Sequence, residues 1–404
     1  MSPGAARLDV ARVRGLFPGL SDGFVHADGP AGSLVPESVL RAVTQAMRVP
    51  IANRGGVFPS SARAEQLVSG ARSAVADLVG GVPQGVVLGP NMTSLTYTMA
   101  RTLAKTWRPG DEVVVSRLDH DANVRPWVLA AAAAGATVRW VDFDPVTSEL
   151  PVAAVAAQLT DRTRLVAVTA ASNLIGTMPD VRAIAELTHA AGALLYVDGV
   201  HYTAHGVVDV REFGADFFAC SPYKFLGPHC GVVAGRADVL AELRPAKLLP
   251  SPDRVPERFE LGTLPYEVMA GATAAVDFLA DMTNAAGSRR ERLVASLEAL
   301  EVHEDGLRQR IELGLEELAG VRIHSTASRR TPTLLVTFDG RDAAEISAVL
   351  AEHDVNAPAG SFYAYEAARL LGLGDAGGLR IGLAPYNTAA DVDRLLRVLG
   401  DALR

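Results

Sequence analysis

Residues 217–228 read FFACSPYKFLGP, an apolar run followed by a single lysine, Lys224, with aromatic and aliphatic residues on both sides. Burying an ammonium group costs free energy unless its pKa falls, it is paired, or the amine is used covalently. The alternative is a lysine at a sheet edge whose aliphatic stem crosses apolar surface while the amine reaches water. The segment therefore indicates a strand end that carries either a reactive amine or such an edge lysine.

The same alternation of short apolar runs and helix-length segments extends from about residue 62 to residue 240. It predicts strands at 85–88, 111–116, 137–143, 164–169, 194–198, 217–220 and 231–234. Helices are predicted at 93–105, 123–134, 151–159 and 181–191, the last with Asp180 as its N-cap. Strands that alternate with helices in this way predict an α/β fold with a mainly parallel seven-stranded sheet between helices.

The pattern changes beyond about residue 282. A long charged helix is predicted at 288–318, followed by strands at 321–324, 333–338 and 379–383, helices at 343–352 and 389–403, and a loop at 357–365. A polar, small-residue stretch at 284–287 is typical of a domain boundary. We therefore expect a large domain at 31–284, a smaller C-terminal α+β domain at 285–404, and an N-terminal arm at 1–30 that contributes to the small domain or the active site.

Composition and charge exclude several classes of protein. The 404 residues include 38 Lys and Arg against 46 Asp and Glu, a net charge of −8, with no basic run of the kind that nucleic-acid binders carry. No apolar stretch approaches the ~20 residues of a membrane span, and residues 1–20 lack the apolar centre of a secretion signal. Two cysteines cannot build a disulfide framework. We expect a cytoplasmic enzyme with no metal site and no nucleic-acid or membrane partner.

Polar side chains follow several of the predicted strands. Asp198 ends the apolar strand 194–198, and His120 follows the strand 111–116. In a parallel sheet, ligands bind beyond the carboxyl ends of the strands, so these residues are expected at the ligand edge together with Lys224. Alone, Asp198 is also compatible with a turn or N-cap, and a single histidine is more often structural. Their recurrence at successive strand ends favours a common site.

Residues 91–94, Asn-Met-Thr-Ser, follow a strand and open a helix. Free amides at Met92 and Thr93 would favour a phosphate, and Ser221 and Tyr223 could add hydroxyl donors, although Thr and Ser are also ordinary N-caps. A lysine can form a Schiff base with an aldehyde, and a carboxylate can keep a pyridine nitrogen protonated. The combination of amine, carboxylate and phosphate cradle fits one cofactor, pyridoxal 5′-phosphate (PLP).

At the level of motifs, nearly the whole chain resembles the class V aminotransferase and cysteine desulfurase group of fold-type I PLP enzymes. The resemblance starts at HADGPAG (26–32) and extends to the C-terminal helix. It is carried by DHDAN (119–123) with PW (126–127), SNLIGT (172–177), DGVH (198–201), SPYKFLGP (221–228), FELGT (259–263) and LRIGLAPYNT (379–388).

The resemblance implies a role for several of these residues in holding the cofactor. His120 would stack on the PLP ring, and Asp198 would bind the pyridine nitrogen. Asn173 and His201 would contact the 3-oxygen of the ring, with His201 standing where many members have Gln. Lys224 would form the Schiff base, with Tyr223 in place of the histidine that precedes the lysine in many relatives.

The resemblance also implies contacts with a partner and with the substrate. Thr263 would reach the phosphate of the neighbouring subunit, which implies a homodimer with shared active sites. Arg380 would bind the α-carboxylate of an amino-acid substrate through its bidentate guanidinium. Asn53, Phe362 and Tyr363 are candidates for the wall of the substrate pocket, and the alternative is that their segments pack in a dimer interface or in the core.

The chain departs from the desulfurases of this family at one position. Desulfurases carry a mobile cysteine ahead of the carboxylate-binding arginine, and the corresponding segment here, APAGSFYAY (357–365), has none. Cys220 is expected to be buried, and Cys230 lies near the lysine motif but away from the family's position. Because a serine cannot hold a persulfide, the sequence disfavours the persulfide route.

The most favoured reaction is then β-elimination, a C–S lyase reaction on a cysteine-type substrate or an S-cysteinyl conjugate such as those of secondary metabolism. Lys224 would move the proton. Transamination, epimerisation and decarboxylation of another amino acid remain alternatives. A true desulfurase that uses Cys230 and a PLP-binding protein without turnover are the remaining, less favoured possibilities.

Overall fold

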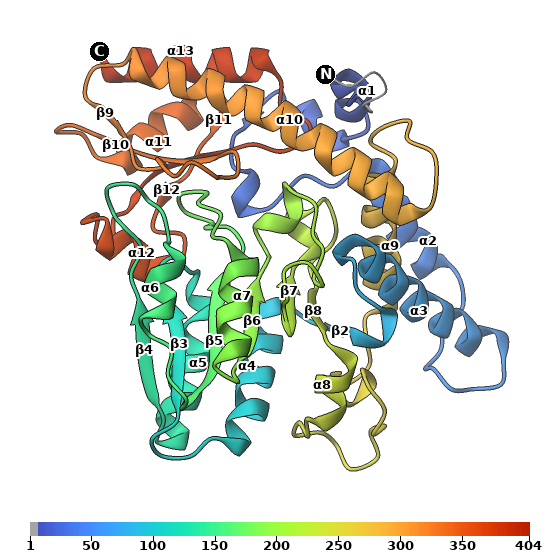
Figure 1. The fold of residues 1–404 in the computed structure, drawn as a ribbon. Helices are drawn as coiled ribbons and strands as arrows, with labels where there is room; N and C mark the ends of the chain where they lie inside the picture. Colours follow the sequence, from blue (N-terminus) through green and yellow to red (C-terminus); the bar gives the residue numbers. More distant parts are fainter. Residues whose placement is uncertain (1–6) are drawn as a thin grey trace.

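The computed structural model describes residues 7–404, which form a seven-stranded sheet, a four-stranded sheet and a two-stranded sheet with helices around them (Figure 1). Residues 1–6 lie outside the described residues. They are the start of the predicted N-terminal arm and of the segment 1–20 that lacks the features of a secretion signal. Within 7–404, no helix combines the length and the apolar composition that crossing a membrane requires.

The larger sheet contains seven strands in the spatial order β2-β8-β7-β6-β5-β3-β4. In chain order they are β2 (Val86–Gly89), β3 (Glu112–Ser116), β4 (Thr137–Val141), β5 (Thr163–Thr169), β6 (Leu194–Asp198), β7 (Phe217–Cys220) and β8 (Gly231–Gly235). Strand β8 runs antiparallel to its neighbours β2 and β7, whereas β5, β6 and β7 pair in parallel. The predicted mainly parallel seven-stranded sheet is confirmed, with strand ends shifted by one or two residues.

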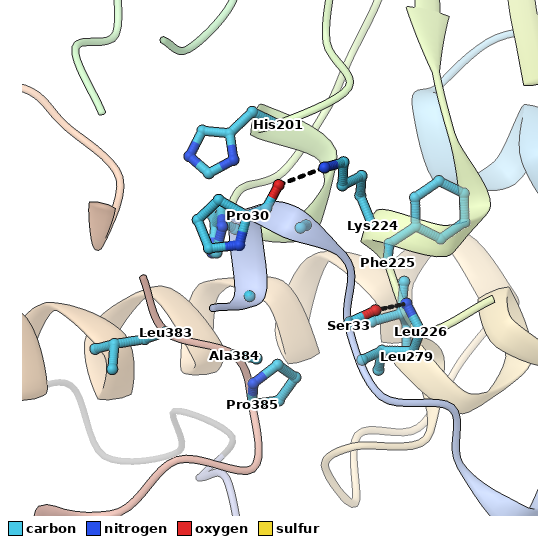
Figure 2. A pocket seen from close by; sticks show the side chains of 13 residues that line it. Pro30, Ser33, His201, Lys224, Phe225, Leu226, Leu279, Leu383, Ala384 and Pro385 are labelled. Carbon is cyan, nitrogen blue, oxygen red and sulfur yellow. Dashed lines mark hydrogen bonds between the residues drawn. The ribbon is translucent and has the colours of Figure 1, made fainter. Parts of the chain in front are cut away.

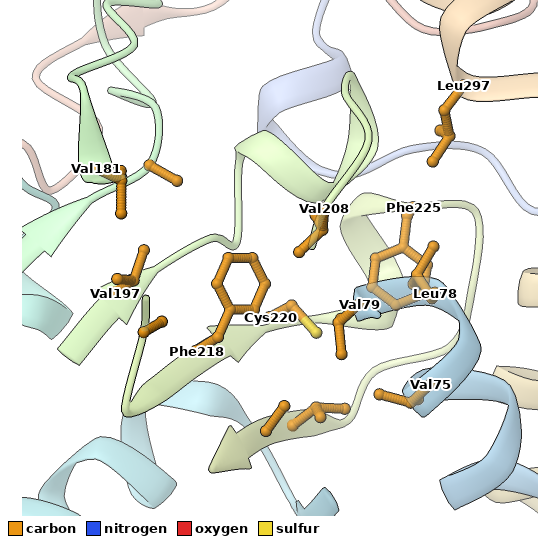
Figure 3. Close-up of a cluster of buried hydrophobic side chains, with 14 of the residues drawn as sticks. Val75, Leu78, Val79, Val181, Val197, Val208, Phe218, Cys220, Phe225 and Leu297 are labelled. Carbon is orange, nitrogen blue, oxygen red and sulfur yellow. The ribbon is translucent and has the colours of Figure 1, made fainter. Parts of the chain in front are cut away.

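Successive side chains of a strand point to opposite faces of the sheet, and both faces are apolar here because helices cover both of them. On β7, Phe217 and Ala219 belong to the core on one face, and Phe218 and Cys220 belong to the core on the other. Figure 3 shows the second core, where Phe218 and Cys220 lie near side chains of α3 (Pro59–Val79). The other helices in this part of the chain are α1 (Val10–Arg14), α2 (Glu37–Arg48), α4 (Met92–Leu103), α5 (Arg125–Ala134), α6 (Val152–Ala156), α7 (Val181–Ala190), α8 (Ala237–Glu242) and α9 (Tyr266–Ala280).

The smaller sheet is antiparallel, with the order β12-β13-β10-β9. Its strands are β9 (Val321–Ile323), β10 (Thr333–Phe338), β12 (Ala359–Gly360) and β13 (Gly378–Gly382), and α11 (Ala343–Glu352) and α13 (Ala389–Leu403) pack with it. Three of these strands and both helices lie where the sequence predicted them. The predicted loop at 357–365 contains the two-residue strand β12, and α12 (Tyr365–Leu370) begins at its end.

The long helix α10 (Arg289–Glu316) connects the two cores. A capping box between Ser288 and Glu291 starts it. Leu293 near its start packs into the core of the large sheet, whereas Ile311 near its end packs into the core of the small sheet. Strand β1 (Val25–His26) pairs with β11 (Val355–Asn356), which joins the N-terminal segment to the C-terminal part. The division of the chain at residues 30 and 284 stays a prediction.

Gly231 opens β8 against the start of α4. A Cβ at this position would lie 2.1 Å from the carbonyl carbon of Asn91 and 2.3 Å from the amide nitrogen of Met92. We expect Gly231→Ala to displace the N-terminus of α4 and to lower the free energy of unfolding by about 1–3 kcal/mol, measured by chemical denaturation. Gly306→Ala in α10, where a Cβ meets open space, is the matched control. Unchanged stability in Gly231→Ala would contradict this close approach.

Candidate active site

The carboxyl ends of the parallel strands meet at one edge of the large sheet. Asp198 ends β6 and is paired with Thr169, the last residue of β5. His120 follows β3, and Lys224 follows β7 in a short 3-10 turn. This edge is where α/β sheets bind ligands. The three side chains therefore lie together at the edge that the sequence predicted for them.

A cavity of about 640 Å³ opens at this edge. Of the predicted site residues, it is lined by Met92, Thr93, His120, Asn173, Asp198, His201, Ser221, Tyr223, Lys224, Phe362, Tyr363 and Arg380. The pocket is of the size that holds a cofactor-sized molecule together with a small ligand. Residues from both sheets contribute, since Arg380 lies on β13 of the small sheet.

The cavity also contains residues that the sequence analysis did not single out. Thr169 could have been found, because it ends a strand at the same sheet edge as Asp198. Tyr97 lies one helical turn after Thr93 on α4, so its position follows from that of the helix start. Pro30 and Arg125 line the cavity as well, but only the folded chain brings Pro30 next to a lysine 194 residues away.

The Lys224 amine is largely buried in the cavity wall. It donates a hydrogen bond to the carbonyl oxygen of Pro30 (Figure 2). Both residues also line a small adjoining pocket of about 10 Å³. The amine nitrogen lies 4.8 Å from the centre of the Tyr223 ring. Burial and the positive charge of Arg380 lower the pKa of Lys224 to about 7, while Asp198 acts in the opposite direction. Lys224 therefore supplies a substantial fraction of free amine at neutral pH.

This lowered pKa predicts how the reactivity of Lys224 depends on pH. Only the free amine reacts with acetic anhydride, so acetylation of Lys224 in the protein without cofactor should rise with pH and reach half its limit near pH 7. Mass spectrometry of peptides after short pulses measures this rate. Arg380→Gln should move the midpoint upward, because it removes a positive charge that disfavours protonation. A midpoint near the ordinary lysine value of about 10.4 would contradict the buried amine.

Asp198 is buried and lines the cavity. One of its oxygens accepts a hydrogen bond from the backbone N–H of Val200 at 2.9 Å. Burial raises the pKa of Asp198 to about 6, while the Val200 N–H and the charge of Lys224 lower it. Asp198 is thus mostly ionised at neutral pH, and a cationic group bound beside it would favour the ionised form further.

A chain of hydrogen bonds holds the turn that carries His120. The Asn123 side chain donates to Asp119 at 2.7 Å and accepts from the indole N–H of Trp127 at 3.0 Å. The Nδ1 atom of His120 accepts from the backbone N–H of Ala122 at 3.0 Å, which leaves the ring proton on Nε2. Burial, and then the charge of Lys224, lower the pKa of His120 to about 4, so this ring is neutral at pH 7.

The Arg380 guanidinium is buried, with 2% of the residue exposed. Its Nη1 donates to the neutral backbone carbonyl of Asn173 at 2.9 Å, its Nε has no hydrogen-bond partner among residues 7–404, and its face lies 3.7 Å from the Phe362 ring centre. Burial lowers the pKa of Arg380 to about 9. The charge of Asp28 opposes this shift. A buried cation whose hydrogen-bonding and stacking partners are neutral is suited to binding an anion from solution.

The first turn of α4 forms another part of the cavity wall. Asn91 is its N-cap and accepts a hydrogen bond from the backbone N–H of Ser94 at 2.8 Å. Met92 and Thr93 begin the helix and line the cavity together with Ser221 and Tyr223. Backbone N–H groups at a helix start, hydroxyl groups and the helix dipole together favour an anion there.

Two predicted residues lie outside the cavity of a single chain. Asn53 accepts a hydrogen bond from the Ser61 hydroxyl through its backbone carbonyl, and Thr263 is exposed. Neither lines the cavity. For Thr263 this placement is compatible with the expected contact to a neighbouring subunit. The roles of both residues stay predictions.

The two cysteines of the chain are both buried, and neither lines the cavity. Cys220 lies within β7, as expected from the sequence, and burial raises the pKa of its thiol above the ordinary range. Cys230, close to the lysine motif in sequence, belongs to the hydrophobic core of the large sheet. Burial raises the pKa of its thiol to about 12.

Comparison with known proteins adds relatives that match along the whole chain. The sequence profile of the family described as Aminotransferase class-V matches residues 25–395. An uncharacterized protein of Mycobacterium tuberculosis is 36% identical over 394 residues, covering 97% of this chain and 98% of the relative. Aminotransferase-like protein FGM3 of Gibberella zeae is 30% identical over 408 residues, covering 98% of each chain.

The cysteine desulfurase CsdA of Escherichia coli is similar in both sequence and structure. It is 30% identical over 409 residues, covering 97% of each chain. Its crystal structure superposes with a TM-score of 0.87 at 28% sequence identity, covering 98% of each chain. The fold described above is therefore that of cysteine desulfurases.

Proposed function

This chain belongs to the class-V aminotransferase family, and from that premise we propose that it is a PLP-dependent C–S lyase. Its substrate in this proposal is a cysteine that carries a substituent on sulfur. β-Elimination with one water molecule converts this substrate into pyruvate, ammonium and the free thiol. The observation that carries the proposal is a cavity that presents an amine, a carboxylate and an arginine but no thiol.

The residues of the cavity fit PLP. The start of α4, with Ser221 and Tyr223, offers donors for its phosphate, and Asp198 offers a carboxylate for its ring nitrogen. The buried Oδ1 atom of Asn173 has no hydrogen-bond partner among residues 7–404, which fits an additional polar group bound in the cavity. Members of this family use PLP, and the donor set of this chain supports the same cofactor here.

When bound, PLP supplies an electron sink for the electron pair left at the substrate Cα. Lys224 takes the Cα proton in this proposal, because a pKa of about 7 makes its amine a base at neutral pH. Asp198 holds the proton on the ring nitrogen. Arg380 binds the substrate α-carboxylate through a guanidinium whose hydrogen-bond partner in the protein is the neutral Asn173 carbonyl.

The position of the cysteines supports elimination over persulfide transfer. A persulfide route requires a thiolate that reaches the substrate sulfur, and thiolate formation is disfavoured for a buried thiol. Cys220 and Cys230 are both packed in the core, where their thiol pKa values are raised. The sulfur of a bound cysteine derivative therefore leaves as a thiol instead of being transferred to the protein.

The segment in place of the desulfurase cysteine loop supports a substrate larger than cysteine. Phe362 and Tyr363 adopt left-handed backbone conformations with φ of 53° and 59°. The Phe362 carbonyl oxygen accepts a hydrogen bond from the Asn173 side chain at 2.9 Å, and the Tyr363 carbonyl oxygen accepts one from the backbone N–H of Asp121 at 2.7 Å. Tyr363 is 75% exposed, and its ring stacks on that of His120 with ring centres 5.5 Å apart. It offers an aromatic surface at the cavity wall for a sulfur substituent.

Product analysis tests this proposal. The purified PLP-loaded protein is incubated with L-cysteine and a panel of S-alkyl and S-aryl cysteines, and the products are identified by mass spectrometry. Pyruvate together with the thiol in equal amounts is the expected result. Cys230→Ser should react at the same rate as the unmodified protein.

Other products would overturn the C–S lyase assignment in distinguishable ways. Alanine with sulfur bound to the protein, lost in Cys230→Ser, would establish desulfuration. Transamination is the second candidate, because one relative that matches the whole chain is named an aminotransferase-like protein. It would yield the 2-oxo acid with the sulfur substituent retained. Solvent deuterium at Cα of an otherwise intact amino acid would indicate epimerisation.

A further inference from the structure

Three buried ionisable side chains lead from the cavity to the long helix α10. His201 lines the cavity, His205 lies next to it, and Glu304 on α10 forms the far end. We propose that Glu304 and His205 are positioning residues that fix the His201 imidazole for contact with the cofactor. This inference rests on the proposed binding of PLP.

Each of these three side chains contacts the next one directly. The Nδ1 atom of His205 lies 2.8 Å from Oε2 of Glu304, and both residues are buried. The rings of His201 and His205 meet edge to face, with centres 4.8 Å apart. His201 and His205 also border the small pocket of about 10 Å³ that Lys224 lines, and Figure 2 shows His201 at this pocket. The series of contacts from Glu304 through His205 to His201 therefore borders both the cavity and the small pocket beside the Lys224 amine.

The other side of the His201 ring is held by the small sheet. Its Nε2 lies 2.9 Å from the hydroxyl of Thr331 and 3.0 Å from that of Thr333 at the start of β10. Rotation of the ring would break these contacts and the packing against His205. Two elements distant in sequence, β10 and α10, thus specify the orientation of one side chain in the cavity.

Burying the Glu304 carboxylate costs free energy that apolar packing alone does not offset. It is 1% exposed, and its Oε1 has no hydrogen-bond partner among residues 7–404. A carboxylate in this position costs free energy unless it is paired, and its partner here is His205. A buried pair of this kind specifies one arrangement of its members, and such a fixed arrangement is what orienting His201 requires.

The electrostatic surroundings of His201 are compatible with this role. Burial, and then the charges of His205, Arg380 and Lys224, hold the pKa of His201 well below its ordinary range. The ring is therefore neutral and has one donor and one acceptor nitrogen. With Nε2 at the threonine hydroxyls, Nδ1 remains for a polar group of the cofactor.

A double-mutant cycle on PLP affinity tests the inference without relying on turnover. Glu304→Gln keeps the shape of the side chain and removes its charge. We expect it to weaken PLP binding roughly tenfold when His201 is present and by less than about twofold in a His201→Gln background. Glu298→Gln, the same change at an exposed position of α10, should leave PLP affinity unchanged.

The outcomes separate positioning from structural stabilisation. Equal weakening in both backgrounds, or no weakening by Glu304→Gln, would overturn the proposal, and thermal unfolding of the cofactor-free variants records any general loss of stability. If Glu304→Gln does not fold, His205→Asn provides the same cycle, because it removes the middle member of the chain. Failure of the unmodified protein to bind PLP would instead overturn the proposed function.

Discussion

Lys224→Ala is expected to reduce turnover of an S-substituted cysteine by at least about 10⁴-fold. The substitution removes the amine that takes the Cα proton and leaves no other lysine in the cavity, because the remaining two, Lys105 and Lys247, do not line it. It also removes the group that bonds to the cofactor aldehyde, so the visible absorbance of that linkage should disappear. Steady-state kinetics and absorption spectra measure the two effects.

The matched control for this prediction is Lys105→Ala. Lys105 donates to the backbone carbonyl of Arg244, away from the cavity, so its replacement should leave both rate and spectrum unchanged. Retention of the absorbance band and of measurable turnover in Lys224→Ala would show that another amine carries the chemistry.

Asp198→Asn is expected to lower kcat/KM by about 10²–10⁴-fold with a smaller change in PLP affinity. The amide keeps an oxygen that can accept the Val200 N–H, so the local backbone is preserved. It loses the negative charge that favours a proton on the ring nitrogen, and the cofactor then stabilises charge at Cα less well. Kinetics of elimination and an equilibrium titration with PLP separate the two effects.

Asp142→Asn is the control for Asp198→Asn. Asp142 forms an exposed ion pair with Arg117 outside the cavity, and such pairs contribute little. Its replacement should leave kcat/KM within about twofold. Equal activity of Asp198→Asn and the unmodified protein would contradict the assigned role of the carboxylate.

The large sheet could be predicted because its strands are short β-branched runs between helix-length segments. All seven strands, and α7 with its Asp180 cap, follow from that pattern. The ligand edge followed from the sheet, since Asp198 and Lys224 stand at strand ends. The meeting of these side chains at one sheet edge could therefore be predicted from local sequence combined with one rule about parallel sheets.

Other features depend on tertiary contacts that local sequence does not encode. Helices α2 and α3 both pack on α9, and the largely apolar α9 lacks the periodicity that identifies an amphipathic helix. The link between His205 and Glu304 joins residues 99 positions apart. The burial of Cys230 likewise follows from the packing of the large-sheet core, although the residue is close to Lys224 in sequence.

The most direct measurement of the central claim is to locate the cofactor on the protein. The PLP-loaded protein is reduced with borohydride, digested, and its peptides are analysed by mass spectrometry. The chain has three lysines, so Lys105 and Lys247 serve as internal controls. One phosphopyridoxyl group on Lys224, with none on the other two, is the predicted result. A modified Lys105 or Lys247 with unmodified Lys224, or no modification at all, would contradict the account.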